Sequence, residues 1–222
     1  LGIQLMVDLS VHRRALECLN FTFFFAPAFH PVFKAIMPAR KALAAEGQKT
    51  IFNLLGPMIN PAQPKHQLMG VYSRSWIKPI AEAMDALELK GGLIVHGVPV
   101  PNSALDELSC AGGNYHQGFG ALSHYSGELD LADAGLAECD SEELKGGSVD
   151  ENVAMLFDFA NNNGATIKHG LSDSIYLNVA AGLLSVGKVD TLREGVHIAK
   201  ETVEEGHLLN WLNQVKAFYS DI

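Results

Sequence analysis

The stretch TIFNLLGPMINPA, residues 50–62, decides the fold of this chain. Its first half, residues 50–55, is apolar with β-branched positions and predicts a short strand that runs into Gly56-Pro57. A stiff loop at the end of a parallel strand is a position where such sheets bind ligands. From composition alone, a tight connection in which Asn53 and Asn60 satisfy loop backbone groups is the better interpretation.

After this stretch the sequence alternates between strand and helix patterns. Residues 67–72 and 93–96 predict two strands, and residues 75–87 predict an amphipathic helix between them. This spacing predicts βαβ units, and therefore an α/β fold with a mostly parallel sheet flanked by helices. Residues 111–136 are rich in Gly, His and Tyr and predict further strands and turns.

Helical patterns occupy both ends of the chain. In the first part, a helix at residues 11–19 is expected to be capped by Ser10. A second helix is expected at residues 32–46, with a break or a first turn at Pro38 and a stop at Gly47. The later helices are predicted at residues 149–161 with a cap at Ser148, 174–186, 191–206 with a cap near Asp190, and 208–219.

The composition limits the classes of protein to which the chain can belong. The chain has 222 residues, 48% of them hydrophobic, which suffices for one core or for one core plus a small helical subdomain. The formal net charge is −9 and the longest basic run is Arg13–Arg14. Nucleic-acid binding is therefore not expected, because it usually needs a basic face.

Cysteine usage and hydropathy bear on the compartment. Cys18, Cys110 and Cys139 lie far apart without a CxxC pair, which fits a reducing compartment and predicts a cytoplasmic protein. No apolar run approaches the roughly 18–20 residues needed to cross a bilayer, so no membrane association is expected. The chain opens at Leu1 without a signal peptide, and we expect it to begin partway into a longer protein.

Two groups of residues have the chemistry of a binding site. Asp106-Glu107 follows a predicted strand and can bind Mg²⁺, which prefers oxygen ligands; the alternative is a solvated acidic pair or a helix start. His30 and Arg40 can recognise a small carboxylate substrate, through a bidentate arginine. The alternative is a helix-capping histidine and a surface arginine, and spacing alone favours it.

The segment LKGGSVDEN, residues 144–152, places two glycines before a helix, where backbone N–H groups can approach an anion. A lone Gly-Gly pair is more often a turn. The sequence contains no GxGxxG, Walker, GxSxG or HExxH motif, and its histidines lack zinc-binding spacing with the cysteines.

The order of these motifs carries more information than any one of them. FFFAPAFHPVFK, PARKAL, KTIFNLLGPMINPA, GVY, VHG, LDELS, LKGGSVDEN, LNVAAGLLSVGK and REGVHIAKETVEEG succeed one another along nearly the whole chain. In this order they resemble anthranilate phosphoribosyltransferase. The resemblance implies a fold of the nucleoside phosphorylase and phosphoribosyltransferase type. Residues 1–46 would then belong to a small helical domain, and residues 47–222 to the α/β domain without its N-terminal strands.

The resemblance also implies a function. Such enzymes transfer phosphoribosyl from phosphoribosyl pyrophosphate to anthranilate, release pyrophosphate, require Mg²⁺ and are commonly homodimers. By motif position, Asp106 and Glu107 would bind Mg²⁺, Arg40 would engage the anthranilate carboxylate, and Phe29 and His30 would line the anthranilate site. No side chain is assigned as a catalytic acid or base, because metal and positioning can carry most of the barrier.

The chain departs from the family pattern in several places. The family's N-terminal part, which carries a Gly-rich GTGGD pyrophosphate loop and a KHG motif ahead of the position of Leu1, is absent, so we expect the chain alone not to catalyse the full reaction. Ala104 stands where a glycine is usual before LDE, and Lys49 replaces a common arginine. Two alternatives remain open: a related transferase or nucleoside phosphorylase with another acceptor, and a non-catalytic homologue that binds a ligand or partner.

Overall fold

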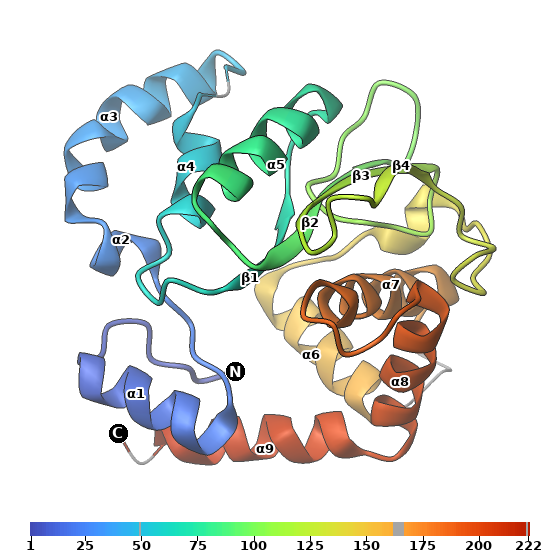
Figure 1. Ribbon diagram of the computed structural model, residues 1–222. Coiled ribbons are helices and arrows are strands. Elements are labelled where there is room, and N and C mark those ends of the chain that lie inside the picture. Colours follow the sequence, from blue (N-terminus) through green and yellow to red (C-terminus); the bar gives the residue numbers. More distant parts are fainter. Residues whose placement is uncertain (49, 162–166, 221) are drawn as a thin grey trace. The chain divides into compact units, whose positions relative to one another are not determined.

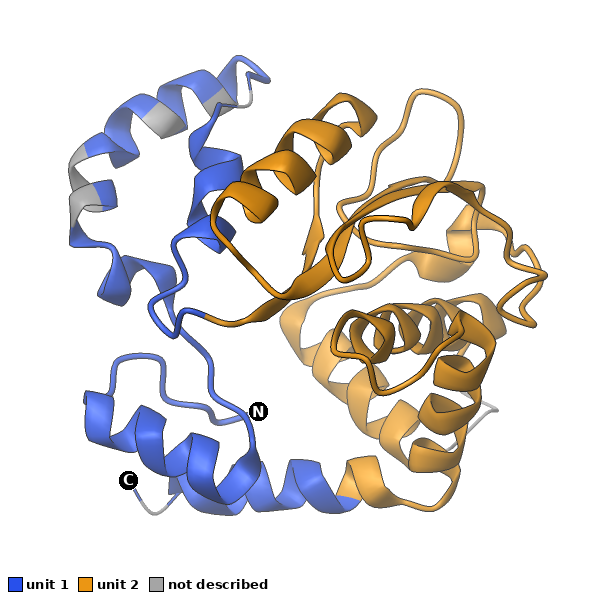
Figure 2. Cartoon of the chain, viewed as in Figure 1, with its two compact units in different colours: residues 1–63, 210–222 blue, residues 64–209 orange. Residues whose placement is uncertain are grey.

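The computed structural model describes residues 1–48, 50–161, 167–220 and 222, without the side chains of several residues in the helix at 31–45. The chain forms two compact units (Figure 2). The first unit comprises Leu1–Gln63 and Asn210–Ile222, and the second comprises Pro64–Leu209. The domain boundary at residues 46/47 stays a prediction.

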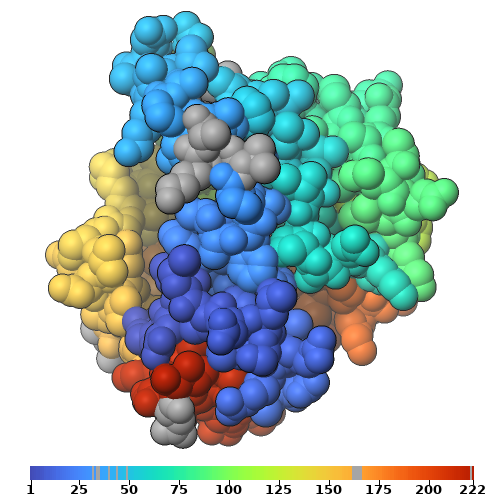
Figure 3. Space-filling model, turned by 90° about the vertical axis from the view of Figure 1, so that its left-hand side faces the viewer, coloured from blue at the N-terminus to red at the C-terminus, as the bar shows by residue number. Residues whose placement is uncertain are grey.

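The first unit is helical. It contains α1 (Leu9–Leu19), α2 (Ala26–Phe29), α3 (Pro31–Ala45), α4 (Phe52–Met58) and the last part of α9 (His207–Ser220) (Figure 1). The N-terminal segment and the C-terminal helix lie side by side on its surface (Figure 3). The buried cluster between them is made of Ala15, Leu19, Val215 and Tyr219. Trp211 closes it, since its indole Nε1 donates to the Leu19 carbonyl at 3.0 Å.

Three details of these helices test the sequence predictions. The cap at Ser10 is wrong, because α1 already begins at Leu9 and Asp8 precedes it. The break at Pro38 is also wrong, because α3 continues through that residue to Ala45. The stop at Gly47 is confirmed: its φ is +72°, and the N–H of Gln48 donates to the Leu43 carbonyl at 2.9 Å, as in a Schellman motif.

The predicted strand at residues 50–55 is wrong, because this stretch forms α4 instead. A short apolar run does not distinguish a strand from a helical turn by periodicity. The simpler interpretation of the two asparagines is confirmed. Asn53 Oδ1 accepts from the Thr50 N–H at 2.9 Å, and Asn60 Oδ1 accepts from the Ala62 N–H at 2.9 Å.

The second unit is built on a four-stranded sheet of order β1-β2-β3-β4. Its strands are β1 (His66–Gly70), β2 (Gly91–Val98), β3 (Gly113–Gly120) and β4 (Ser126–Leu129). Only β1 and β2 pair in parallel; β2–β3 and β3–β4 are antiparallel. The α/β class is confirmed, but the prediction of a mostly parallel sheet is wrong. Parallel neighbours need a crossover, and only the β1–β2 connection carries a helix, α5 (Ile77–Ala86).

The helices of this unit cover both faces of the sheet (Figure 1). A short turn, η1 (Arg74–Trp76), leads into α5, which packs on β2 and β3, whereas α7 (His169–Ser185) packs on β1 and β2. This sandwich explains why β2 is buried along nearly its whole length. The remaining elements are η2 (Ser141–Leu144), α6 (Val149–Ala160) and α8 (Leu192–Glu204).

The four later helices lie where the sequence predicts them, except that α7 begins at His169, five residues before the predicted start at residue 174. Ser148 caps α6 with a full capping box, as expected. The cap of α8 is Thr191, one residue after the predicted position. Close packing of α7 on α8 requires Gly195, because a Cβ there would lie 2.6 Å from Ala180 Cα. The three cysteines are free thiols. Within the described ranges, no helix has the length and apolarity needed to cross a membrane.

Candidate functional site

Asp106 and Glu107 lie beside the carboxyl ends of the two parallel strands. The segment that carries them pairs with β2 through Leu105, whose N–H and carbonyl bond with Gly97 at 2.8 and 3.0 Å. Glycines make this close approach possible. A side chain at Gly70, the last residue of β1, would overlap the Asp106 carbonyl, and a Cβ at Gly97 would lie 2.6 Å from the Glu107 carbonyl oxygen. The pair therefore occupies the sheet edge where α/β folds bind ligands.

Other polar side chains hold the following residues in place. Asn178 from α7 bonds with both the N–H and the carbonyl of Leu108, at 3.1 and 2.7 Å. Asn114 from β3 bonds in the same way with Ser109, at 2.9 and 2.7 Å. Ser174 Oγ accepts from the Cys110 N–H at 2.8 Å. Sequence reasoning missed these residues, and the only signal was a polar residue within the small-residue stretch NVAAGLL.

The two carboxylates themselves remain exposed to solvent. Partial burial raises the pKa of Glu107, and the charge of neighbouring Asp106 raises it further. Two adjacent carboxylates that repel each other are a suitable donor set for a hard divalent cation. Among the described residues, no group of three or more His, Cys, Asp or Glu side chains converges as a metal site. This pair fits Mg²⁺, which usually takes one or two carboxylates and completes its shell with water and phosphate oxygens.

Phe29 and His30 belong to the first unit, where aromatic rings hold them. The Phe29 ring packs edge-on against Phe24, with centroids 4.8 Å apart, and contacts His12 at 5.0 Å. His30 lies 5.4 Å from the ring of Phe33, which in turn meets Phe52 of α4 at 5.7 Å. The stretch at residues 50–62 therefore supports the segment that carries His30.

Arg40 lies in α3, but its side chain lies outside the described part of the structure. Its predicted contact with a carboxylate stays a prediction. The five predicted site residues thus divide between the units, with Phe29, His30 and Arg40 in the first and the acidic pair in the second.

The Gly-Gly segment before α6 uses its N–H groups internally. The Gly147 N–H donates to Asn152 Oδ1 at 2.8 Å, and the Ser148 N–H donates to the Glu151 carboxylate at 2.6 Å. Hydrogen bonds from the backbone and the side chain of Ser148 lower the pKa of Glu151. The interpretation as a turn is favoured, because the N–H groups of Gly147 and Ser148 are already satisfied within the segment.

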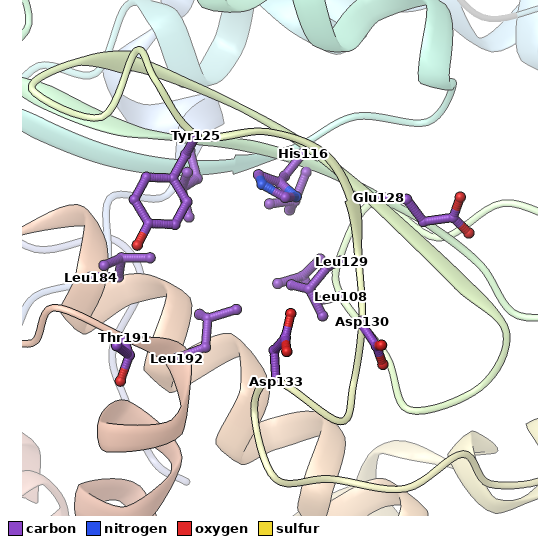
Figure 4. A pocket seen from close by; sticks show the side chains of 12 residues that line it. Leu108, His116, Tyr125, Glu128, Leu129, Asp130, Asp133, Leu184, Thr191 and Leu192 are labelled. Carbon is purple, nitrogen blue, oxygen red and sulfur yellow. The ribbon is translucent and has the colours of Figure 1, made fainter.

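A cavity of about 380 Å³ lies between strands β2–β4 and the helices α7 and α8 (Figure 4). Buried leucines and Val95 form its apolar wall, while Tyr125 and Asp133 extend into it (Figure 4). His116 also lines it; burial lowers the pKa of this imidazole, and its Nδ1 has no hydrogen-bond partner among the described residues. Sequence reasoning missed this cavity, because its residues come from segments far apart in the chain.

Residues 1–209 match the protein family described as the glycosyl transferase family, a/b domain. The chain belongs to this family. The resemblance to anthranilate phosphoribosyltransferase that the motif order indicated is confirmed. The Petrotoga mobilis anthranilate phosphoribosyltransferase is 34% identical over 218 residues, which are 98% of this chain and 60% of the relative. The Tolumonas auensis anthranilate phosphoribosyltransferase is 36% identical over 217 residues, or 97% and 61%.

Solved structures of anthranilate phosphoribosyltransferases agree with this assignment. The crystal structure of the Thermus thermophilus enzyme is 35% identical and superposes with a TM-score of 0.81, over 93% of this chain and 58% of that one. The Saccharomyces cerevisiae structure in complex with PRPP and Mg shares the fold, with a TM-score of 0.81 at 24% identity over 97% and 59% of the two chains. The chain thus spans about three fifths of the length of these relatives.

Proposed function

We propose that the protein takes part in the transfer of a phosphoribosyl group from phosphoribosyl pyrophosphate to anthranilate, with release of pyrophosphate. The observation that carries this proposal is the acidic pair at residues 106 and 107. It stands exposed at the carboxyl ends of β1 and β2, in a chain 34–36% identical to anthranilate phosphoribosyltransferases. An exposed pair on a fixed backbone suits the capture of a magnesium-bound polyphosphate.

In this proposal Asp106 and Glu107 hold Mg²⁺ at the pyrophosphate end of the site. When bound, the cation would neutralise charge that develops on the leaving pyrophosphate. The chain's own contribution is to fix the direction of the carboxylates, through the Gly97 pairing before them and the side-chain bonds after them. The protein need not supply a strong acid or base, because pyrophosphate leaves as an anion and can take up the proton that the acceptor amine loses when it bonds to ribose C1.

We assign acceptor binding to the aromatic segment of the first unit. Phe29 and His30 would line the site of the aromatic acceptor, held by the ring contacts of Phe24 and Phe33. Arg40 would pair with the acceptor carboxylate, since a guanidinium matches a carboxylate with two parallel hydrogen bonds. We also propose a homodimer, as in the family that the sequence resembles.

The test is an assay with anthranilate, phosphoribosyl pyrophosphate and Mg²⁺ that follows the loss of anthranilate fluorescence. It uses, in parallel, the 222-residue chain and the product of whichever gene encodes it. We expect turnover that EDTA abolishes. No turnover of anthranilate together with turnover of another acceptor would overturn the proposal. Turnover by the 222-residue chain alone would contradict the expectation that half of the phosphate cradle is missing.

The role of Arg40 is tested in the same assay. Arg40→Ala should raise the KM for anthranilate more than the KM for phosphoribosyl pyrophosphate, because it removes only the carboxylate partner. Equal effects on both values would contradict the assignment.

A further inference from the structure

The two carboxylates of the acidic pair lie between two fixed points of the backbone. Before them, Leu105 pairs with Gly97 through two hydrogen bonds of 2.8 and 3.0 Å. After them, Leu108 is bonded at both its N–H and its carbonyl by one side chain, Asn178. The direction in which Asp106 and Glu107 leave the segment is therefore set by these two anchors.

Asn178 has the geometry of a clamp. Its Oδ1 accepts from the Leu108 N–H at 3.1 Å, while its Nδ2 donates to the Leu108 carbonyl at 2.7 Å. The same Nδ2 donates to the Ser174 carbonyl at 2.8 Å, which fixes the amide on α7 itself. Only a side chain with both a donor and an acceptor can bond with both groups of one residue. An aspartate, for example, would lose the donor.

The rest of the segment does not depend on Asn178. Asn114 and Ser174 hold the next two residues, Ser109 and Cys110, with hydrogen bonds of 2.7–2.9 Å. Asn114 and Ser174 are buried, whereas Asn178 is only partly buried, so water can replace part of what Asn178 provides. Loss of Asn178 should therefore release the end nearest the carboxylates and leave the fold in place.

We propose that Asn178 is a positioning residue for the Asp106–Glu107 pair, holding Leu108 so that both carboxylates face one divalent cation. This inference rests on the metal role given to the pair in the proposed function. Asn178 does not touch the cation or a substrate; it acts through the backbone of the residue that follows Glu107.

The chain offers a matched control. Asn152 of α6 clamps Gly147 in the same way, with hydrogen bonds of 2.8 and 3.1 Å to its N–H and carbonyl. This second clamp is exposed and holds a segment to which no ligand role is given. Asn152→Ala removes the same chemical groups as Asn178→Ala and should leave the metal site unchanged.

The experiment measures the binding of Mn²⁺, used as the probe ion, to the 222-residue chain. The electron paramagnetic resonance signal of the free ion gives the unbound concentration. The variants are Asn178→Ala, Asn152→Ala and the double variant Asp106→Asn/Glu107→Gln. We expect Asn178→Ala to raise the Mn²⁺ dissociation constant about tenfold, the lower end of the range for loss of an outer-shell partner. Asn152→Ala should bind as the wild type does, and the double variant should lose the site. Both asparagine variants should stay folded, and the unfolding temperature should fall more in Asn178→Ala, which loses three partly buried hydrogen bonds, than in Asn152→Ala, which loses two exposed ones.

The outcomes distinguish the positioning role of Asn178 from the metal role of the Asp106–Glu107 pair. Wild-type Mn²⁺ affinity in Asn178→Ala, with loss in the double variant, would overturn the positioning role and leave the metal pair intact. Equal affinity in the wild type and the double variant would overturn the metal assignment and the inference with it. If Asn178→Ala is unfolded, Asn178→Ser replaces it, since the shorter hydroxyl cannot reach both groups of Leu108. Wild-type affinity in that folded variant would equally overturn the inference.

Discussion

Two loops of the second unit use the same device for different ends. In each, an asparagine amide bonds with both backbone groups of one residue: Asn178 with Leu108 and Asn152 with Gly147. The first clamp reaches across 70 positions of the chain to another element, whereas the second reaches across five. The loop that carries the exposed Asp106 and Glu107 is thus held by a side chain from a distant element. The loop before α6 is held by a neighbouring side chain, and its polar groups bond with each other.

The carboxylates of the two loops differ in their hydrogen bonding and in the direction of their pKa shifts. Glu151 accepts hydrogen bonds from the Ser148 N–H and hydroxyl, which lower its pKa. Asp106 and Glu107 are exposed, and the pKa of Glu107 is raised by partial burial and by its neighbour. An acidic pair whose members repel each other is open to a cation, whereas a satisfied carboxylate is a structural cap.

The largest effect is expected from removing the charges of the acidic pair. Asp106→Asn/Glu107→Gln keeps the shape of both side chains, so the fold should persist while Mn²⁺ affinity falls. Because outer-shell changes already cost about 10–100-fold, loss of both ligands should cost more than about 100-fold. Titration with Mn²⁺ measures this, with Asp150→Asn/Glu151→Gln as the matched acidic pair at the other loop. Equal loss in both double variants would indicate nonspecific charge attraction.

The next largest effect is expected on stability, where the backbone of Asp106 approaches Gly70 of β1 closely. Gly70→Ala would force the Asp106 backbone away from the strand, because the new methyl group overlaps its carbonyl. We expect the free energy of unfolding to fall by about 1–3 kcal/mol, as for overpacking of a core. Urea denaturation measures it.

Gly182 in α7 is the control for this change, since an added Cβ there meets nothing within 4 Å. Gly182→Ala should be neutral or should stabilise by up to about 1 kcal/mol, because alanine is the better helix former. A Gly70→Ala protein as stable as the wild type would show that the loop does not depend on this contact.

A smaller effect is expected at the second loop. Ser148→Ala removes the cap of α6 and should lower the free energy of unfolding by about 1 kcal/mol. Mn²⁺ affinity should not change, because this loop has no part in the metal site. Denaturant titration and Mn²⁺ binding of the same variant check both statements. A loss of Mn²⁺ affinity in Ser148→Ala would contradict the statement that this loop has no part in the metal site.

The smallest effect is the pH dependence of that cap. Since the folded pKa of Glu151 lies below its ordinary value of 4.5, its contribution to stability is present above the unfolded pKa. That contribution is lost as the pH falls through the folded pKa. The difference in stability between the wild type and Glu151→Gln should therefore shrink between pH 7 and pH 3, as followed by urea denaturation. A constant difference would show that the carboxylate charge contributes nothing.

The sequence predicts features that depend on neighbours in the chain. The cap at Ser148, the stop at Gly47 and the strands around Leu68 and Leu93 follow from local patterns, and the structure has them. The helix at Phe52–Met58 is not predicted, since a short apolar run fits a strand or a helical turn equally well.

Features that depend on distant contacts are out of reach of such patterns. The direction of β3 and β4 is set by pairing across the sheet, and the Asn178 clamp on Leu108 exists only once α7 packs on the sheet. The motif position of the acidic pair indicates its role, but nothing in its spacing indicates that Gly70 and Gly97 admit its backbone to the strand ends.

The most direct test of the account is a nuclear magnetic resonance titration of the 222-residue chain with Mn²⁺, which broadens amide signals close to the bound ion. If the cation binds the acidic pair, the amides of Gly70, Gly97, Asp106 and Glu107 broaden first, and those of Gly147 and Ser148 stay sharp. Early broadening at Gly147 and Ser148, or equal broadening throughout the chain, would contradict the assignment of the cation to the acidic pair.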